Sequence, residues 1–245
     1  MPVRPTIRDF LFAVRYLTIV PVPDGGALGP ATIFFPFVGM LIGFCVAVLD
    51  GFPILPDPAR AALLVLCLAV LSRWSGLRGV ALVGSGLAQA SDRKVVLETM
   101  NAGRKTWTGY LLAAMLAIAK AAILLKPATS GQLLALLFAP MLGRWGMVVV
   151  GFNARLARLG APGPRFEAAI TFREFGWASV MAAGLMLAWL EAIGLLILLG
   201  AAVVSVVLRL LWHRWLGGVN ETTFHATAEI VETAALASFA LLKLQ

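Results

Sequence analysis

Charged residues are scarce in this chain. Asp, Glu, Lys and Arg make up only 13% of its 245 residues, where a soluble domain averages about 25%. Hydrophobic residues make up 60%, and the mean hydropathy is +0.92. A soluble domain of this length cannot enclose so much apolar surface in one core. The composition therefore excludes a soluble domain and predicts an integral membrane protein.

Cysteine and histidine are also rare, with two of each. Cys45 and Cys67 both lie inside apolar runs, which is typical of small core side chains rather than of a disulfide or a metal pair. His213 and His225 have no Cys or Asp between them, so they do not form a recognisable ligand spacing. We expect both histidines at the membrane interface.

Acidic residues are outnumbered, with 12 Asp and Glu against 20 Lys and Arg and a net charge of +8. The basic residues are not interleaved with aromatic ones, so nucleic acid is not an expected partner. Cytoplasmic loops enriched in Lys and Arg explain the charge more simply. With the N-terminus inside, only Arg60, Lys126 and Lys243 fall in external segments. This bias predicts a cytoplasmic N-terminus and an external C-terminus.

Apolar runs recur along the chain, and about 20 such residues are needed to cross a bilayer. The sequence predicts an all-α, polytopic membrane helix bundle with the bilayer as its partner, forming a single domain over 1–245. Roughly seven spans are expected on this criterion. Their predicted ranges are 31–49, 61–74, 107–125, 132–152, 176–192, 195–212 and 224–242.

The N-terminal segment 1–28 is predicted to be an interfacial helix followed by a loop. Residues 5–20 place apolar side chains at helical spacing with arginines elsewhere, and the run is too short to span. A Pro-Val-Pro-Asp-Gly-Gly sequence then ends the helix.

The connector 76–109 is expected to be a cytoplasmic loop, and part of 75–87 is a candidate for a re-entrant segment buried in protein. Four glycines fall within 76–86, and no Gly-Lys-Ser/Thr follows them, so this is not a nucleotide-binding P-loop. The connector also carries five basic residues against two acidic ones. The basic residues are Arg78, Arg93, Lys94, Arg104 and Lys105, and the acidic ones are Asp92 and Glu98.

Ionisable groups inside spans are costly and are functional candidates by default. Arg144 lies in the predicted span 132–152, and Glu229 and Glu232 share one face of 224–242. We expect an Arg144–Glu229 pair, either as a structural ion pair or in contact with substrate. Arg73 and Arg209 lie near span ends and are expected to extend toward the interface.

Lys120 and Glu191 are each compatible with two locations, the bundle interior and the membrane interface.

Several motifs, in order and spacing, resemble the cobalamin (cobalamin-5'-phosphate) synthases, which are adenosylcobinamide-GDP ribazoletransferases of bacterial inner membranes. The motifs near the start are Leu-Thr-Ile-Val-Pro-Val-Pro at 17–23 and Ala-Thr-Ile-Phe-Phe-Pro-Phe-Val-Gly-Met-Leu-Ile-Gly at 31–43. Further similarity lies at 97–100, 104, 109, 144–147, 154–155, 217–219 and 226–232. The resemblance covers nearly the whole chain and implies a membrane enzyme of cobalamin biosynthesis.

The departures from this family fall at its acidic motifs. The family signature His-Leu-Asp-Gly-Leu-Ala-Asp-Thr-Ala-Asp-Gly aligns with 76–86, where its three aspartates become Arg78, Leu82 and Ser85 and its histidine becomes Gly76. Its Lys-Asp-Ser-Arg becomes Asn-Ala-Gly-Arg at 101–104, and its Thr-Gly-Asp becomes Asn-Glu-Thr at 220–222.

The resemblance implies that the missing aspartates hold Mg²⁺ at the substrate phosphates. Mg²⁺ needs oxygen ligands in near-octahedral geometry, which the replacements do not provide, so no metal or other cofactor is expected. Arginine can contact phosphate directly. The predicted sites for a corrinoid or nucleotide-like anion are Arg78, Arg104, Arg144 and Arg155, with Glu229 and Glu232 as polar partners in the spans.

Three hypotheses follow. The chain is a catalytically degenerate family member kept as a binding or structural subunit, a ribazoletransferase with an altered site, or a subunit or assembly factor of another membrane complex.

Overall fold

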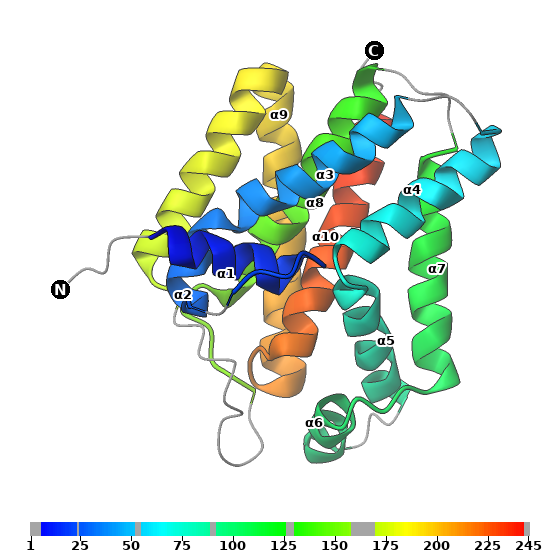
Figure 1. The fold of residues 1–245 in the computed structure, drawn as a ribbon. Helices are drawn as coiled ribbons and strands as arrows, with labels where there is room; N and C mark the ends of the chain where they lie inside the picture. The colour runs from blue at the N-terminus through cyan, green and yellow to red at the C-terminus, as the bar shows by residue number, and fades with distance from the viewer. Residues whose placement is uncertain are drawn as a thin grey trace.

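The structure, a computed structural model, describes residues 6–23, 25–51, 55–88, 92–125, 130–157 and 170–242. Within these ranges the chain is helical and forms no strand (Figure 1), with two isolated bridges, Phe152–Ile170 and Leu156–Val219. The helices are α1 (Ile7–Leu17), α2 (Leu28–Ala31), the 3-10 helix η1 (Thr32–Phe34), α3 (Phe35–Asp50), α4 (Asp57–Leu71), α5 (Ser75–Ala88), α6 (Arg93–Asn101), α7 (Trp107–Ile123), α8 (Ser130–Gly151), α9 (Phe172–Leu216) and α10 (Glu221–Leu241).

The all-α class is confirmed, but the expected seven spans are not. In the described residues, three helical stretches are long and apolar enough to cross a membrane: Leu28–Asp50, Gly131–Gly151 and Phe172–Leu216. Helices α4 and α5 add a fourth if they count together, although they are bent by 87°. Helix α7 is apolar but shorter. Every predicted run is largely helical. The counts differ because α9 covers two of the predicted runs, and because other helices are too short or too polar.

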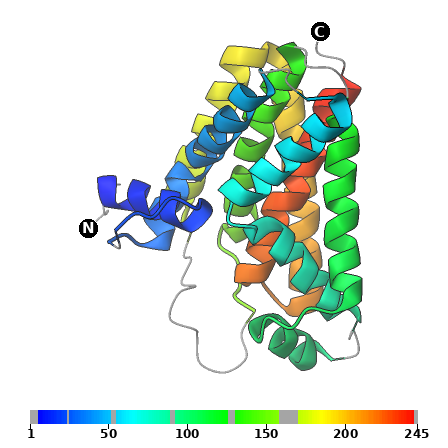
Figure 2. The ribbon, with the colours of Figure 1, turned by 45° about the vertical axis from the view of Figure 1, so that its right-hand side comes forward.

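Helix α9, 45 residues long, reverses its direction partway along. Glu191 has non-helical angles, with φ 51° and ψ −138°, and the two arms run antiparallel in Figures 1 and 2. A straight helix of this length would extend about 68 Å at 1.5 Å per residue, roughly twice a hydrocarbon core of about 30 Å. The arms lie where the sequence predicts the runs 176–192 and 195–212.

Helix α8 is the central element, packed between α3 and α10 (Figure 1). Glycines let the backbones approach closely. A Cβ added at Gly39 of α3 would lie 2.5 Å from the carbonyl oxygen of Pro140, and one at Gly43 would lie 2.4 Å from that of Leu136. Small residues at helix crossings are the usual means of tight packing inside membranes.

The connector 76–109 differs from the predicted loop, because helices α5 and α6 occupy most of it. Helix α5 is buried along Val80–Gly86, so its main-chain polar groups are satisfied within the helix, as burial requires. The expectation of buried chain at 75–87 therefore agrees with the structure, while the expectation of irregular backbone does not.

The turn between α4 and α5 ends α4 in a left-handed conformation without glycine. Arg73 and Trp74 have φ of 55° and 58°. Their N–H groups donate to Val70 and Ala69 carbonyls at 2.9 and 2.7 Å, the Schellman pattern of helix ends. Such backbone costs about 1–3 kcal/mol at a non-glycine residue and persists only where the surroundings hold it.

Helix α1 confirms the amphipathic helix predicted within 5–20, and its interfacial position stays a prediction. A capping box between Thr6 and Asp9 begins it. Its buried face, which includes Ala13 and Leu17, packs toward α2 and α3.

A buried polar cluster joins the C-terminal end of α3 to the N-terminal ends of α4 and α8. Arg60 pairs with Asp50, and Gln132 donates to Asp50 at 3.1 Å. Arg60, which the sequence places in an external segment, is therefore buried in an ion pair. Lys126 and Lys243, the other external basic residues, lie outside the described residues.

The glycine contacts predict how tightly α5 and α10 are packed. A Cβ at Gly79 would lie 2.6 Å from the backbone nitrogen of Ala226, and backbone cannot move aside as a side chain can. Gly79→Ala is therefore expected to lower the free energy of unfolding by about 1–3 kcal/mol, measured by denaturant titration in detergent. The control is Gly200→Ala, where nothing lies within 4 Å. Equal effects of the two variants would contradict the close packing.

Candidate functional site

A network of four charged side chains lies inside the bundle. Lys120 Nζ of α7 lies 2.5 Å from Glu229 Oε1 and 2.7 Å from Glu232 Oε1, both on α10. Arg144 of α8 pairs with the second oxygen of Glu232 and lies 3.5 Å from the Pro140 carbonyl. All four charged residues are buried, with Lys120 and Glu232 only 1% exposed. Two cations thus offset two carboxylates, so the burial leaves no net charge.

The helices place these groups for identifiable reasons. Helix α7 buries only Gly109 and Lys120 of its residues, so it presents an apolar outer face and directs one charged side chain inward. Glu229 and Glu232 are spaced i, i+3 and share one face of α10. Breaking a buried ion pair is costly because the remaining charge has no partner. Lys120 therefore belongs to the bundle interior, one of the two positions that the sequence leaves open.

The predicted pairing of Arg144 with Glu229 was wrong by one helical turn. Arg144 pairs with Glu232, and Lys120 holds Glu229. The sequence places both glutamates on one face but does not show which of them the partner helix approaches. With its guanidinium engaged by Glu232, Arg144 fits the structural ion pair better than contact with substrate.

Glycine at position 76 makes room for this network. A Cβ added at Gly76 would lie 2.1 Å from Glu229 Oε2 and 3.0 Å from Glu229 Cβ. The carboxyl group of Glu229 therefore occupies the space into which any side chain at this position of α5 would extend.

Positions 78, 82 and 85, where the resemblance places aspartates, lie on α5 in different surroundings. Leu82 is buried, and Ser85 is fully buried. The Ser85 hydroxyl donates to the Ala81 carbonyl and accepts from the Thr106 N–H, both at 2.8 Å. Arg78 is exposed.

Mg²⁺ does not fit these residues. It requires oxygen ligands in near-octahedral geometry, usually with one or two carboxylates, and the three α5 positions provide one hydroxyl, already engaged in two hydrogen bonds, and no carboxylate. Across the part of the chain that the structure describes, no three His, Cys, Asp or Glu residues lie close enough together to hold a metal ion.

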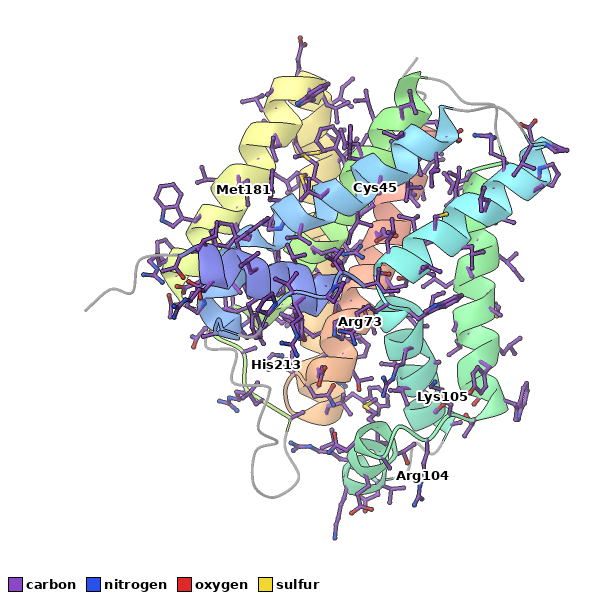
Figure 3. The ribbon with its side chains drawn as sticks, viewed as in Figure 1. Cys45, Arg73, Arg104, Lys105, Met181 and His213 are labelled. Atoms are coloured by element: carbon purple, nitrogen blue, oxygen red, sulfur yellow. The ribbon has the colours of Figure 1, made fainter. Side chains whose placement is uncertain are left out.

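Of the predicted anion-binding arginines, the structure brings Arg78 close to the segment that contains Arg104. A Cβ added at Gly103 would lie 3.9 Å from Arg78 Nη2. Arg104 is exposed, and its N–H donates to the Thr99 carbonyl at 3.1 Å. In Figure 3, Arg104 and Lys105 lie beside α6 at one end of the bundle.

Arg155 lies in another setting. It is exposed, its N–H lies 3.4 Å from His213 Nε2, and its carbonyl accepts from Val219 at 2.8 Å. These contacts join the chain after α8 to the end of α9, and none of them involves Arg78.

Arg209 differs from its expected role at the membrane interface. Its guanidinium donates to the carbonyls of Phe152, Val149 and Asn153, at 3.3 Å for Val149. Because these carbonyls lie at the C-terminal end of α8, the cation satisfies acceptors that have no partner within the helix.

The sequence did not point to a group around His225. The His225 ring stacks on Tyr16 with centroids 5.1 Å apart, and the charges of Arg144, Arg78 and Arg73 all act on it. The Tyr16 hydroxyl is buried and has no hydrogen-bond partner in the described residues. Burial, together with the charge of Glu221, raises the pKa of Tyr16 well above its usual range.

Only the tertiary fold brings this group together, since its members come from α1, the α4–α5 turn, α5, α8 and α10. The lone histidine at position 225 was the available signal, but nothing in its sequence neighbourhood indicated Tyr16 as its partner.

This fold and its buried charges define an all-helical membrane protein with a charged interior. The sequence model of the family described as Cobalamin-5-phosphate synthase matches residues 9–240. The chain belongs to this family, whose members are membrane proteins of cobalamin biosynthesis. The resemblance drawn from its motifs is thereby confirmed.

Curated relatives carry the same activity in their names. A protein from Roseiflexus sp. (strain RS-1), named adenosylcobinamide-GDP ribazoletransferase, is 34% identical and is aligned over 94% of this chain and 88% of its own length. A protein of that name from Syntrophobacter fumaroxidans is 33% identical and is aligned over 93% of this chain and 96% of its own length. A third, from Pseudomonas aeruginosa, is 29% identical and is aligned over 97% of this chain and 100% of its own length. No solved structure gives a significant match.

Removing one member of the four-charge network should destabilise the bundle. Lys120→Met leaves two carboxylates facing one arginine, and we expect a loss of about 3–5 kcal/mol in unfolding free energy. Adding Glu229→Gln removes the extra negative charge, so the double variant should be more stable than Lys120→Met alone. Denaturant titration in detergent measures both. Lys105→Met, at an exposed position, is the control, and an equal loss there would contradict the network's role.

Aspartates introduced on α5 should affect folding differently at buried and at exposed positions. Ser85→Asp places a charge in a fully buried position where a Cβ at Gly109 would already lie 2.3 Å from the serine hydroxyl. We expect poor folding, seen as reduced monodisperse yield and a lower melting temperature. Arg78→Asp is exposed and should fold normally. A stable Ser85→Asp protein would show that the site still accommodates the acidic motif.

Proposed function

We propose that this chain is a catalytically degenerate member of the cobalamin-5-phosphate synthase family, retained as a membrane binding or structural subunit. The observation that carries the proposal is the set of residues at 78, 82 and 85, which are an exposed arginine, a buried leucine and a buried serine. Ser85 takes part in packing between α5 and the start of α7 through its bond to Thr106. These side chains support helix contacts rather than metal binding.

The frame around them supports retention of the family's cleft for an anionic ligand, corrinoid or nucleotide-like. Gly79 lies against α10, and Gly84 against Gly109 of α7, so small residues preserve the helix crossings at which the family carries its signature. Arg78 gives the exposed end of α5 a positive charge. The expected location is a bacterial inner membrane with the N-terminus in the cytoplasm.

A second possibility is a ribazoletransferase with an altered site, in which Arg78 and Arg104 supply charge in place of a metal, helped by Asp92, Glu98 or Glu221. The closeness of Arg78 to Gly103 favours it. A third is a subunit of another membrane complex. Broad apolar faces of α7 and α9, including Trp107, Trp177 and Trp189, are exposed and would suit either lipid or a protein partner.

An activity assay tests the main proposal. Purified protein is incubated with adenosylcobinamide-GDP, α-ribazole and Mg²⁺, beside the Roseiflexus relative as a positive control. We expect product from the relative and none from this chain, because the described part of the chain places no cluster of three His, Cys, Asp or Glu residues to hold the metal. Turnover comparable to the relative's would overturn the proposal.

Two further measurements separate the alternatives. Activity that survives chelation and disappears in Arg78→Ala would identify the altered transferase. Co-purification of one stable protein partner from the native membrane would identify the subunit, and a monodisperse lone protein would count against it.

A further inference from the structure

We propose that Arg73 and Arg78, together with Tyr16 and His225, form a phosphate-binding site that works without a metal ion. The inference deepens the proposed function and rests on it for the cleft, but it concerns ligand binding rather than the loss of turnover. It assigns a ligand chemistry to two arginines of which one, Arg73, was expected only to reach the membrane interface.

Arg78 provides the first set of donors. Its side chain is exposed and has neither an ion pair nor a hydrogen bond within the described residues. It is nevertheless oriented, because Nη2 lies near Gly103 and the charge acts on His225. A Cβ at Gly79, the next residue, would lie 3.1 Å from the backbone carbon of His225. Arg78 therefore stands where α5 and α10 cross.

Arg73, in the turn before α5, provides a second set of donors, and its charge also acts on His225. The left-handed turn before α5 directs it, and Figure 3 shows it at the junction of α4 and α5. Its Nη1 lies 3.5 Å from the carbonyl oxygen of Arg15, which leaves its other N–H donors available. Strained backbone that positions an available cation is a recurring feature of ligand sites.

Tyr16 and His225 form the inner wall. Their rings are stacked, and the Tyr16 hydroxyl is buried with no hydrogen-bond partner in the described part of the chain. A buried polar atom of this kind is costly unless something satisfies it. A tyrosine hydroxyl is protonated at neutral pH, since its ordinary pKa is about 10, so it can donate a hydrogen bond. The charge of Glu221 also acts on it.

The donor pattern selects an oxyanion, and phosphate in particular. Arginine presents parallel N–H donors that match phosphate oxygens in a bidentate contact, without a metal. Two guanidinium groups and one hydroxyl provide more donors than a single carboxylate can accept, since a carboxylate has about four lone-pair sites. Phosphate and pyrophosphate have more acceptor oxygens and more negative charge. The same chemistry is available from a soluble phosphate ester or from a phospholipid headgroup.

Inorganic pyrophosphate titrated into the full-length protein in detergent tests the site by calorimetry. We expect binding in the presence of EDTA, with an affinity that added Mg²⁺ does not increase. Arg78→Gln and Arg73→Gln should each weaken binding at least tenfold, which corresponds to about 1.4 kcal/mol. Both residues are exposed, so a melting curve can verify that each variant folds.

The matched control is Lys94→Gln, which removes one positive charge from an exposed position on α6 and should leave affinity unchanged. No binding in EDTA, binding that requires Mg²⁺, or equal losses in Lys94→Gln and Arg78→Gln would each overturn the proposal. Nanodiscs distinguish the source of the phosphate. Competition by phosphatidylglycerol but not phosphatidylcholine, lost in Arg78→Gln, supports a headgroup, whereas metal-free binding without that competition supports a soluble ligand.

The two proposals fail separately. Ribazoletransferase turnover would overturn the degenerate enzyme while leaving metal-free binding intact. A protein inactive in the assay that does not bind pyrophosphate in EDTA would leave the first proposal standing and remove the second.

Discussion

The neutral network of Lys120, Arg144, Glu229 and Glu232 joins α7, α8 and α10 through ion pairs inside the bundle. Charges in an apolar interior are tolerated only when paired, and losing one partner costs more than the pair contributes. The network therefore fixes how α7, α8 and α10 are positioned around one another. Helix α5 packs against the same network, because Glu229 fills the space that a side chain at Gly76 would occupy. The positions that would carry the family's aspartates are thus held by an ion network on neighbouring helices.

The residues that hold the fold together are therefore different from those at the family's signature positions on α5. The ion network and the glycine crossings account for the architecture without using Arg78, Leu82 or Ser85 as anything more than packing or surface residues. A family member could therefore lose metal-binding carboxylates from α5 and keep its fold. At position 78, where the resemblance implies an aspartate, this chain has an exposed arginine. Its positive charge is the physical basis for expecting anion binding without a metal.

Hydropathy predicted the helices well, because long apolar runs have few alternatives in a bilayer. The runs at 107–125 and 132–152 appear as α7 and α8 with ends shifted by a few residues. The site was harder to predict. The sequence predicts a loop at the glycine-rich start of α5, since glycine weakens helices in water, whereas in the structure these glycines allow α5 to pack closely against α10. The Glu232 partner of Arg144 and the Tyr16–His225 stack depend on contacts between distant segments, which periodicity cannot show.

The reversal in α9 has a consequence for how the protein sits in a membrane. Glu191 is exposed at the tip between two apolar arms, and an ionised carboxylate is costly in the hydrocarbon region. The tip must therefore reach the headgroup layer. Because the tip joins two helical arms of the bundle, the cost of burying this carboxylate limits how deeply that end of the bundle can be immersed. A bilayer thicker than the hairpin would thin locally around it rather than draw the tip inside.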